Sequence, residues 1–185
     1  MKIYLIRHGQ TDWNVEHRPQ GKADIELNRK GEEQARIVAK EKLNNTKIDL
    51  IICSPLKRAK RTAEIINTDR NIPIIYDERI SERDFGEFEG KTIDEIKNET
   101  KFQGFWNYEY NIQYKKAENI QKFFNRVYEF LDETKEKYRD KNILLVAHGG
   151  VSVPVICYFK GIPKEENLIK MGIKNCEVKE FEIKA

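Results

Sequence analysis

Long apolar runs, a secretion signal and paired cysteines are all missing from this sequence of 185 residues. No apolar stretch approaches the roughly 20 residues that a membrane-spanning helix needs. The chain enters a strand-like pattern at its first residues, which leaves no room for a signal peptide. Its three cysteines, Cys53, Cys157 and Cys176, lack metal-ligand spacing and are odd in number, as is typical of reduced thiols. These absences predict a soluble, cytoplasmic protein without a membrane partner.

Neither sign of charge dominates. The chain carries 34 basic and 31 acidic residues, for a formal net charge of +3, and the two signs are interspersed. This balance argues against a nucleic-acid partner, which would call for concentrated positive charge. A chain of this length can bury a sufficient core on its own, and we expect one domain over residues 1–185.

Apolar strand-like runs alternate with helical patterns along the chain. The strand-like runs cover residues 3–7, 49–53, 73–76, 143–147 and 177–183, and the helical patterns cover residues 31–43, 55–67, 117–138 and 150–160. This alternation predicts a three-layer α/β sandwich with helices on both faces of a mainly parallel sheet. The last run is expected to form an exposed edge strand. Ser54 and Pro55 predict the start of the second helix, as its N-cap and first residue.

Aromatic residues crowd into residues 99–116 without a clear period. They are Phe102, Phe105, Trp106, Tyr108, Tyr110 and Tyr114. One interpretation is a short helix packed on the main body. The other is a cap that shapes the mouth of a site and contacts the organic part of a substrate. The two interpretations are compatible.

Histidine is scarce, yet two of the three histidines directly follow an apolar strand run. Arg7 and His8 stand at the end of the run 3–7, and His148 follows the run 143–147. In open α/β sheets, ligands bind at the carboxyl ends of the strands. We therefore expect both imidazoles at adjacent strand ends, beside the guanidinium of Arg7, in a site for an anion.

Five sequence blocks resemble those of one family. They are RHGQTDWN (7–14), LNRKGEEQA (27–35), CSPLKRA (53–59), SERDFGEFEG (81–90) and AHGG (147–150), in the order of the family. Over about residues 3–155 the chain resembles the histidine phosphatase superfamily, also called the phosphoglycerate mutase-like family. The resemblance implies a phosphoglycerate mutase-like fold and phosphoryl transfer through a phosphohistidine.

The resemblance implies that His8 is the nucleophile. A neutral imidazole attacks phosphorus through one nitrogen while the other keeps its proton against an acceptor, often a backbone carbonyl. Arg7 and Arg58 are expected to bind the phosphoryl oxygens, because a guanidinium offers fork-shaped donors and stays charged. Arg58 is expected in the first turn of its helix, where the helix dipole also favours an anion. His148 is expected as a further donor, more useful when protonated.

One carboxyl group can protonate the leaving alkoxide and then activate a water. Composition alone leaves Glu82, Asp84, Glu87 and Glu89 open for this role, and the family register selects Glu82. Asn14 adds a neutral hydrogen-bond donor for the transferring group.

Four smaller contacts also follow from the resemblance. Thr11, Gln20 and Gly21 match family positions near the substrate, and Gly149 matches a position near the phosphate. His17 carries no chemical argument and is expected to be a solvated loop residue.

Cys53 and Arg58 together raise the alternative of a cysteine phosphatase. Those enzymes place five residues between the nucleophile and the arginine, whereas four intervene here. Because Cys53 closes the apolar run 50–52, we interpret it as a buried strand residue.

No His-rich or carboxylate cluster has the spacing of metal ligands. The arginines and His148 would supply the charge that a bound metal otherwise provides. We therefore expect a metal-independent enzyme without a cofactor.

Within the family, a phosphatase acting on a small phosphorylated metabolite is the favoured prediction. Cofactor-dependent mutases of the family carry paired arginines in the segment between the general acid, here Glu82, and the second His-Gly pair, here His148 and Gly149. Residues 99–117 contain Lys101, Lys115 and Lys116 but no arginine. Alpha-ribazole phosphatase-like, phosphoserine-type and broad specificities all stay open, as does the oligomeric state.

Three other functions are weighed against it. A cofactor-dependent phosphoglycerate mutase is the first alternative, and a phosphohistidine phosphatase acting on proteins is the second. The aromatic residues of 99–116 argue against the second, because compact protein phosphatases of the family tend to lack this insert. A catalytically dead binding protein would lack the nucleophile, an arginine or the acid, and none is missing.

Overall fold

The computed structural model describes residues 1–99, 102–104, 116–163 and 168–183. Within these ranges, five strands form one sheet in the order β3-β2-β4-β1-β5. Their bounds are Lys2–Arg7 (β1), Leu50–Cys53 (β2), Ile74–Tyr76 (β3), Ile143–Ala147 (β4) and Val178–Glu182 (β5). The pairs β1–β4, β2–β4 and β2–β3 are parallel, and β5 lies antiparallel to β1 at one edge. The predicted mainly parallel sheet and its edge strand are confirmed.

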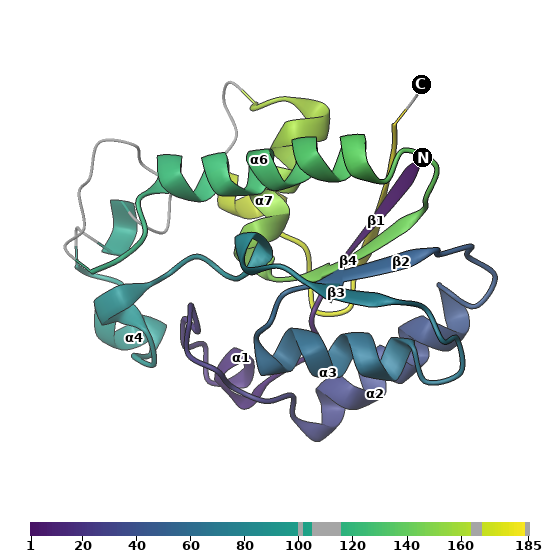
Figure 1. Cartoon of the computed structure of the whole chain (residues 1–185). Coiled ribbons are helices and arrows are strands. Elements are labelled where there is room, and N and C mark those ends of the chain that lie inside the picture. The colour runs from purple at the N-terminus through teal and green to yellow at the C-terminus, as the bar shows by residue number, and fades with distance from the viewer. Residues whose placement is uncertain (100–101, 105–115, 164–167, 184–185) are drawn as a thin grey trace.

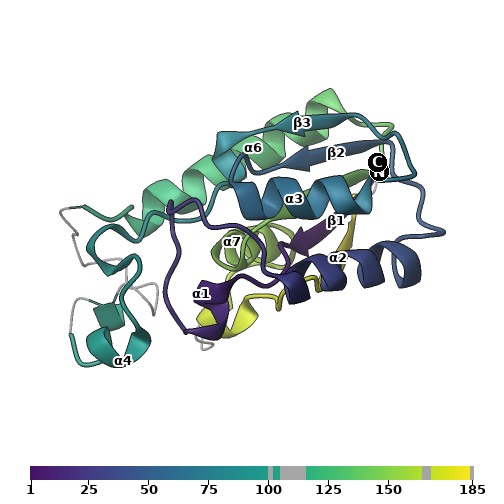
Figure 2. The same ribbon diagram turned by 90° about the horizontal axis from the view of Figure 1, so that it is seen from below.

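Helices cover both faces of this sheet. The four longest described are α2 (Arg29–Glu41), α3 (Lys57–Ile66), α6 (Ile120–Lys137) and α7 (Gly149–Lys160). Figures 1 and 2 show α2 and α3 on one face and α6 and α7 on the other. Strand side chains alternate accordingly: Leu144 and Val146 belong to the core under α2 and α3, and Leu145 to the core under α6 and α7. The predicted three-layer α/β sandwich is confirmed.

The predicted start of α3 is wrong. The helix begins at Lys57 with Leu56 at the N-cap, so Ser54 and Pro55 precede it. Ser54 is fully buried instead, and its Oγ lies 2.7 Å from Nε2 of His148. The serine makes a tertiary contact at the end of the neighbouring strand, which its local sequence does not reveal.

Asparagine caps fix the starts of two other helices. Oδ1 of Asn28 accepts a 2.9 Å hydrogen bond from Gly31 N–H, and α2 begins at Arg29 rather than at residue 31. Oδ1 of Asn119 accepts hydrogen bonds from the first backbone N–H groups of α6, which begins at Ile120 rather than at residue 117.

Several short elements were not predicted, because they are too short to show a helical period. They are α1 (Asp12–Val15), α4 (Ile93–Ile96) and the 3₁₀ turns η1 (Glu78–Ile80), η2 (Gly86–Phe88) and η3 (Leu168–Met171). In α1, Thr11 and Asn14 exchange side-chain to backbone hydrogen bonds in a capping box. This turn holds Asn14 close to the end of β1.

Most of the aromatic segment 99–116 lies outside the described residues, so the cap stays a prediction. Phe102, which is described, is buried next to Ile96. Its ring meets that of Phe88 edge to face, with centroids 5.2 Å apart. At this residue the segment packs on the main body.

Strand register brings the predicted site residues together. Arg7 of β1 pairs with Ala147 of β4, so His8 and His148 follow the same rung of the sheet. His8 N–H donates to the Ala147 carbonyl at 3.0 Å. Ser54, which follows β2, donates its N–H to the carbonyl of Val146 at 3.0 Å. Three neighbouring strands thus end at one place, and the expected position of the two histidines is confirmed.

Candidate active site

His8 is held in the form that a nucleophile needs. The ring is almost fully buried, and its Nδ1 lies 2.7 Å from the carbonyl oxygen of Gly9. Because a carbonyl only accepts, Nδ1 carries the proton and Nε2 keeps its lone pair. Burial, followed by the charges of Arg58 and Arg7, lowers the pKa of His8 well below its usual value. The imidazole is therefore neutral at neutral pH.

The ring of His148 lies beside that of His8. Their centroids are 5.2 Å apart, with the planes at 60°. Nε2 of His148 bonds with Ser54 Oγ, and the buried Nδ1 has no hydrogen-bond partner within the described residues. If the Ser54 hydroxyl donates to Nε2, Nδ1 carries the proton and is available to donate.

His148 was expected to be a donor that is more useful when protonated, and the unliganded site disfavours the protonated form. Burial, followed by the charge of Arg58, lowers its pKa well below the usual value, and nearby His8 and Arg7 act in the same direction. A cluster of positive groups cannot hold another proton without an anion. His148 is therefore a neutral donor until an anion arrives.

Arg58 lies in the first turn of α3, as predicted, and is fully buried. Nη1 donates to the carbonyl of Ala23 at 2.7 Å and Nη2 to that of Gly21 at 2.8 Å. Burial lowers its pKa to about 10, so the guanidinium still carries its charge at neutral pH. The backbone of residues 21–23 fixes the orientation of the fork.

Arg7 is held by the segment that precedes β5. Its Nη1 donates to the carbonyl of Ile173 at 3.1 Å, in the segment that precedes β5. Burial lowers the pKa of Arg7, and the carboxylate of Glu82 partly offsets this effect. Both arginines line the same pocket as His8.

Glu82 lines this pocket and is nearly buried. Its Oε1 accepts a 2.9 Å hydrogen bond from Arg83 N–H, and its Oε2 accepts one of 3.0 Å from Gly150 N–H. Gly150 belongs to the first turn of α7, so the carboxylate lies at the positive end of that helix. The geometry thus places one carboxylate in reach of the anion site.

None of the three rival carboxylates lines the pocket. Asp84 accepts the N–H of Gly86, and Glu87 is exposed and does not line the pocket. Glu89 accepts the backbone N–H groups of Lys22, Ala23 and Phe85 at 2.8 to 3.0 Å. Glu89 thereby anchors the very loop whose carbonyls hold Arg58, which is a supporting role that the sequence did not reveal.

The two glycines after His148 make room for two site residues. A Cβ at Gly149 would lie 3.1 Å from Cζ of Arg7, and a Cβ at Gly150 would lie 2.2 Å from Oε1 of Glu82. Gly149 also lines the pocket, as its predicted place near phosphate requires. Gly149 was predicted from the sequence and Gly150 was not, although the repeated glycine was a visible signal.

The amide of Asn14 has a fixed orientation. Its Oδ1 accepts hydrogen bonds from the N–H and the Oγ1–H of Thr11, at 3.1 and 3.2 Å, and from Nδ2 of Asn175 at 3.3 Å. With Oδ1 occupied, Nδ2 of Asn14 is the group that remains for a ligand, and the residue lines the pocket. Asn175 also donates to the carbonyl of His8 at 2.9 Å and was missed by the sequence analysis.

The smaller predicted contacts divide into two groups. Gln20 and the exposed His17 line the pocket. Thr11 and Gly21 do not line it: Thr11 is fully buried behind Asn14, and Gly21 supports Arg58 through its carbonyl. The geometry therefore gives Thr11 and Gly21 supporting positions rather than the substrate contact that was expected.

The pocket has a volume of about 360 Å³ and a lining of both charged and apolar residues. Trp13, Phe85, Ile93 and Val153 contribute apolar surface there. Arg83, which is almost fully buried, adds a cationic side chain that the sequence analysis did not single out.

Cys53 is the buried strand residue that was predicted. It is the last residue of β2, it is fully buried, and its Sγ–H donates to the carbonyl of Ser54. Burial raises the pKa of the thiol, which disfavours the thiolate that a cysteine phosphatase needs.

Within the described residues, no group of three or more His, Cys, Asp or Glu side chains could hold a metal ion. No helix in this part of the chain has the length and apolar character needed to cross a membrane.

Comparison with known proteins identifies the family. The family model of the histidine phosphatase superfamily (branch 1) matches residues 3–185. A protein named uncharacterized phosphatase PhoE, from Bacillus subtilis, is 38% identical over 181 residues, which cover 96% of this chain and 89% of that protein. Phosphoserine phosphatase 1 of Hydrogenobacter thermophilus is 30% identical, over 88% of this chain and 77% of that protein. This chain belongs to the histidine phosphatase superfamily.

Other matches include a different named activity and solved structures. A protein named probable phosphoglycerate mutase GpmB, from Salmonella choleraesuis, is 33% identical over 96% of this chain and 83% of that protein. The structure of Bacillus stearothermophilus YhfR superposes with a TM-score of 0.89 at 32% identity, covering 99% of this chain and 91% of that one. The alpha-ribazole phosphatase of Shigella flexneri gives 0.86 at 28% identity, covering 100% and 91%. The predicted family, fold and phosphatase class are confirmed.

Proposed function

We propose that this protein hydrolyses a small phosphomonoester through a phosphohistidine at His8. The observation that carries the proposal is the hydrogen bond between His8 Nδ1 and the Gly9 carbonyl, which leaves Nε2 as a neutral nucleophile. The guanidinium groups of fully buried Arg58 and of half-buried Arg7 line the same pocket. A phosphoryl dianion fits this combination of one lone pair and fixed positive charge.

In the first step, Nε2 of His8 forms a bond to phosphorus while the bond from phosphorus to the ester oxygen breaks. Arg7, Arg58 and the amide of Asn14 bind the phosphoryl oxygens, and Nδ1–H of His148 adds a further donor. Glu82, in its protonated form, gives its proton to the departing alkoxide. The products of this step are an alcohol, phosphohistidine and the Glu82 carboxylate.

In the second step, water attacks phosphorus and the P–N bond breaks. The Glu82 carboxylate takes a proton from the water, so the same group that acted as the acid now acts as the base. Orthophosphate leaves, and His8 and Glu82 return to their starting protonation states. No other group has to gain or lose a proton over the cycle.

The substrate is a small metabolite with one phosphate. The apolar residues in the pocket lining support this choice, as do relatives named phosphoserine phosphatase and alpha-ribazole phosphatase. Mutase activity is the second candidate, because a relative bears that name. The absence of arginine from residues 99–117 disfavours it, since a mutase has to hold a second phosphate or carboxylate. A cytoplasmic location remains a prediction.

A panel of phosphomonoesters assayed with the purified protein tests the proposal. We expect hydrolysis of small esters in the presence of EDTA and inhibition by vanadate, which adopts the trigonal bipyramidal geometry of the transferring group. Conversion of 3-phosphoglycerate to its 2-isomer, measured in parallel, would favour the mutase. Failure to hydrolyse any ester, or loss of hydrolysis on chelation, would contradict the proposal.

A further inference from the structure

Glu82 lies in an irregular segment, yet a general acid has to be placed accurately. The segment joins the turns η1 and η2, and residues 81–85 have no regular secondary structure. Loops are more mobile than the elements that they connect, unless other groups anchor them. The backbone around Glu82 is anchored by a pair of residues from a distant part of the sequence.

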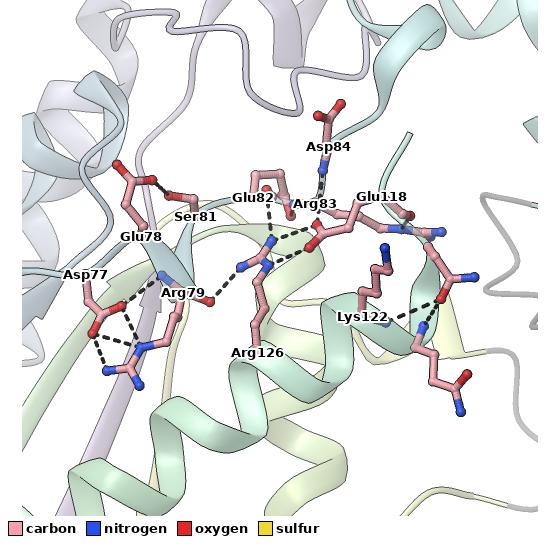
Figure 3. Close-up of polar contacts among 12 residues, drawn as sticks. Asp77, Glu78, Arg79, Ser81, Glu82, Arg83, Asp84, Glu118, Lys122 and Arg126 are labelled. Carbon is pink, nitrogen blue, oxygen red and sulfur yellow. Dashed lines mark hydrogen bonds and ion pairs between the residues drawn. The ribbon is translucent and has the colours of Figure 1, made fainter. Parts of the chain in front are cut away.

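The first member of this pair is Arg126, on α6. Its Nη2 donates to the carbonyl of Glu82 at 3.2 Å, and its Nη1 donates to the carbonyl of Arg79 at 2.6 Å. Nε and Nη2 also bind the carboxylate of Glu118, at 2.6 and 2.8 Å. Figure 3 shows this guanidinium between the segment 79–84 and Glu118. One planar guanidinium group thus joins two backbone carbonyls and one carboxylate.

The second member is Glu118, which lies just before α6. Its Oε2 accepts the N–H of Asp84 at 3.3 Å, and its own N–H donates to the carbonyl of Asp84 at 2.9 Å. The carbonyl of Glu118 further accepts Nε of Arg83 at 3.1 Å. Together, Arg126 and Glu118 hold the main chain before, at and after Glu82.

The ion pair of Arg126 and Glu118 is also largely shielded from solvent, which restricts its motion. The side chains of Arg126 and Glu118 are only 19% and 17% exposed. Charge-assisted bidentate pairs in such surroundings are stronger and better oriented than pairs at the surface. Arg126 further lies over the ring of Phe123, 4.8 Å from its centroid, which restricts the guanidinium plane.

We propose that Arg126 and Glu118 are positioning residues for the acid–base function of Glu82. This inference rests on the proposed function, in which Glu82 protonates the leaving group. A misplacement of about 1 Å can cost about 100-fold in rate, so losing the anchor should weaken proton transfer without removing the nucleophile. The side chains of the pair do not line the pocket, so they act through the backbone of Glu82.

The test compares two esters in the variant Arg126→Lys. A lysine keeps the charge, but its single amine cannot reproduce the planar fork. We expect kcat/KM for an alkyl phosphate to fall about 10-fold to 100-fold more than kcat/KM for p-nitrophenyl phosphate. The ratio of kcat/KM for the alkyl phosphate to kcat/KM for p-nitrophenyl phosphate reports leaving-group protonation. This is because p-nitrophenolate departs without an acid, and kcat/KM excludes the later dephosphorylation step. Glu118→Gln, which keeps the shape of the side chain, is the second variant and should shift the ratio in the same direction.

Arg79→Lys is the matched control. Arg79 pairs with Asp77 and with Glu133, each at 2.7 Å, in the same stretch of chain, and its side chain makes no hydrogen bond to Glu82 or Asp84. We expect it to leave the ratio between the two esters unchanged. In a Glu82→Gln background, Arg126→Lys should add nothing to the ratio, because the group that it positions is already lost.

Two results would overturn the inference. One is an equal loss on both esters in the Arg126→Lys and Glu118→Gln variants. The other is the same change of ratio in Arg79→Lys. Failure of the proposed function would look different, because the unmodified protein would then hydrolyse neither ester or form no phosphohistidine.

Discussion

The backbone N–H of Gly150 donates a 3.0 Å hydrogen bond to Oε2 of Glu82, across 68 positions of sequence. The carboxylate can approach this closely only because residue 150 has no side chain: a Cβ there would lie 2.2 Å from Oε1. The glycine therefore couples the first turn of α7 to the proposed acid.

Gly150→Ala should impair catalysis far more than folding. The clash is with the end of a flexible side chain, and alanine is otherwise favoured over glycine in a helix. We expect kcat/KM for an alkyl phosphate to fall by about 10-fold to 100-fold, with little change in Tm. A large loss of Tm in Gly150→Ala would show that the glycine serves packing instead.

Glu82→Gln should discriminate sharply between leaving groups. An alkoxide needs a proton as it departs, so the alkyl ester should lose about 10²–10⁴ in kcat/KM, whereas p-nitrophenyl phosphate should lose much less. Phosphohistidine should also accumulate with the activated ester, because its hydrolysis needs the same group as a base. Equal losses on both esters without accumulation would argue against Glu82, and Asp84, Glu87 and Glu89 would then be tested in turn.

Stability should decrease at mildly acidic pH. The pKa values of His8 and His148 are lowered in the folded protein, whereas in the unfolded chain they return to about 6.5. Below about pH 6.5 the unfolded state binds more protons, so the free energy of unfolding should fall as the pH falls, by up to about 1.4 kcal/mol per pH unit for each ring. Urea titrations between pH 7.5 and 5.5 measure this slope.

A His8→Asn variant checks the assignment of that slope. The variant removes one imidazole ring. The number of protons taken up on unfolding at acidic pH should therefore fall by about one, and the free energy of unfolding should depend less steeply on pH. Inorganic phosphate should raise the stability of the unmodified protein at both ends of the range, because it binds the folded state alone. An unchanged slope in His8→Asn would mean that His8 is not held neutral by its surroundings.

Cys53→Ala should keep the activity. The thiol is buried in the sheet and its pKa is raised, so it has no part in the chemistry. We expect a loss of stability from the lost packing but nearly unchanged kcat and KM on p-nitrophenyl phosphate. Abolished turnover in a folded Cys53→Ala protein would revive the cysteine mechanism.

Much of the architecture was predictable because it depends on local patterns. The buried strands β1, β2 and β4 stand out as apolar runs, and the family blocks fixed which residues follow them. His8, His148 and Arg58 could be placed together because the parallel strands end, and the helix after β2 begins, at one edge of the sheet.

Contacts between distant segments were not predictable in the same way. Ser54 looked like a helix cap, but its hydroxyl bonds with a histidine 94 positions away. Asn175, Arg126 and Glu118 carry no motif that marks them, because the groups that they hold in the site segments include backbone carbonyls and N–H groups of distant residues. The protonation of His148 also depends on burial, which a sequence pattern does not quantify.

The location of the transferred phosphoryl group tests the central claim most directly. Glu82→Gln protein is mixed with p-nitrophenyl phosphate and quenched in base, where a phosphorus–nitrogen bond survives, and its peptides are then analysed by mass spectrometry. We predict one phosphate on the peptide that contains His8, which disappears in His8→Ala together with the activity. Phosphate on another residue, or a His8→Ala protein that keeps most of its activity, would contradict the account.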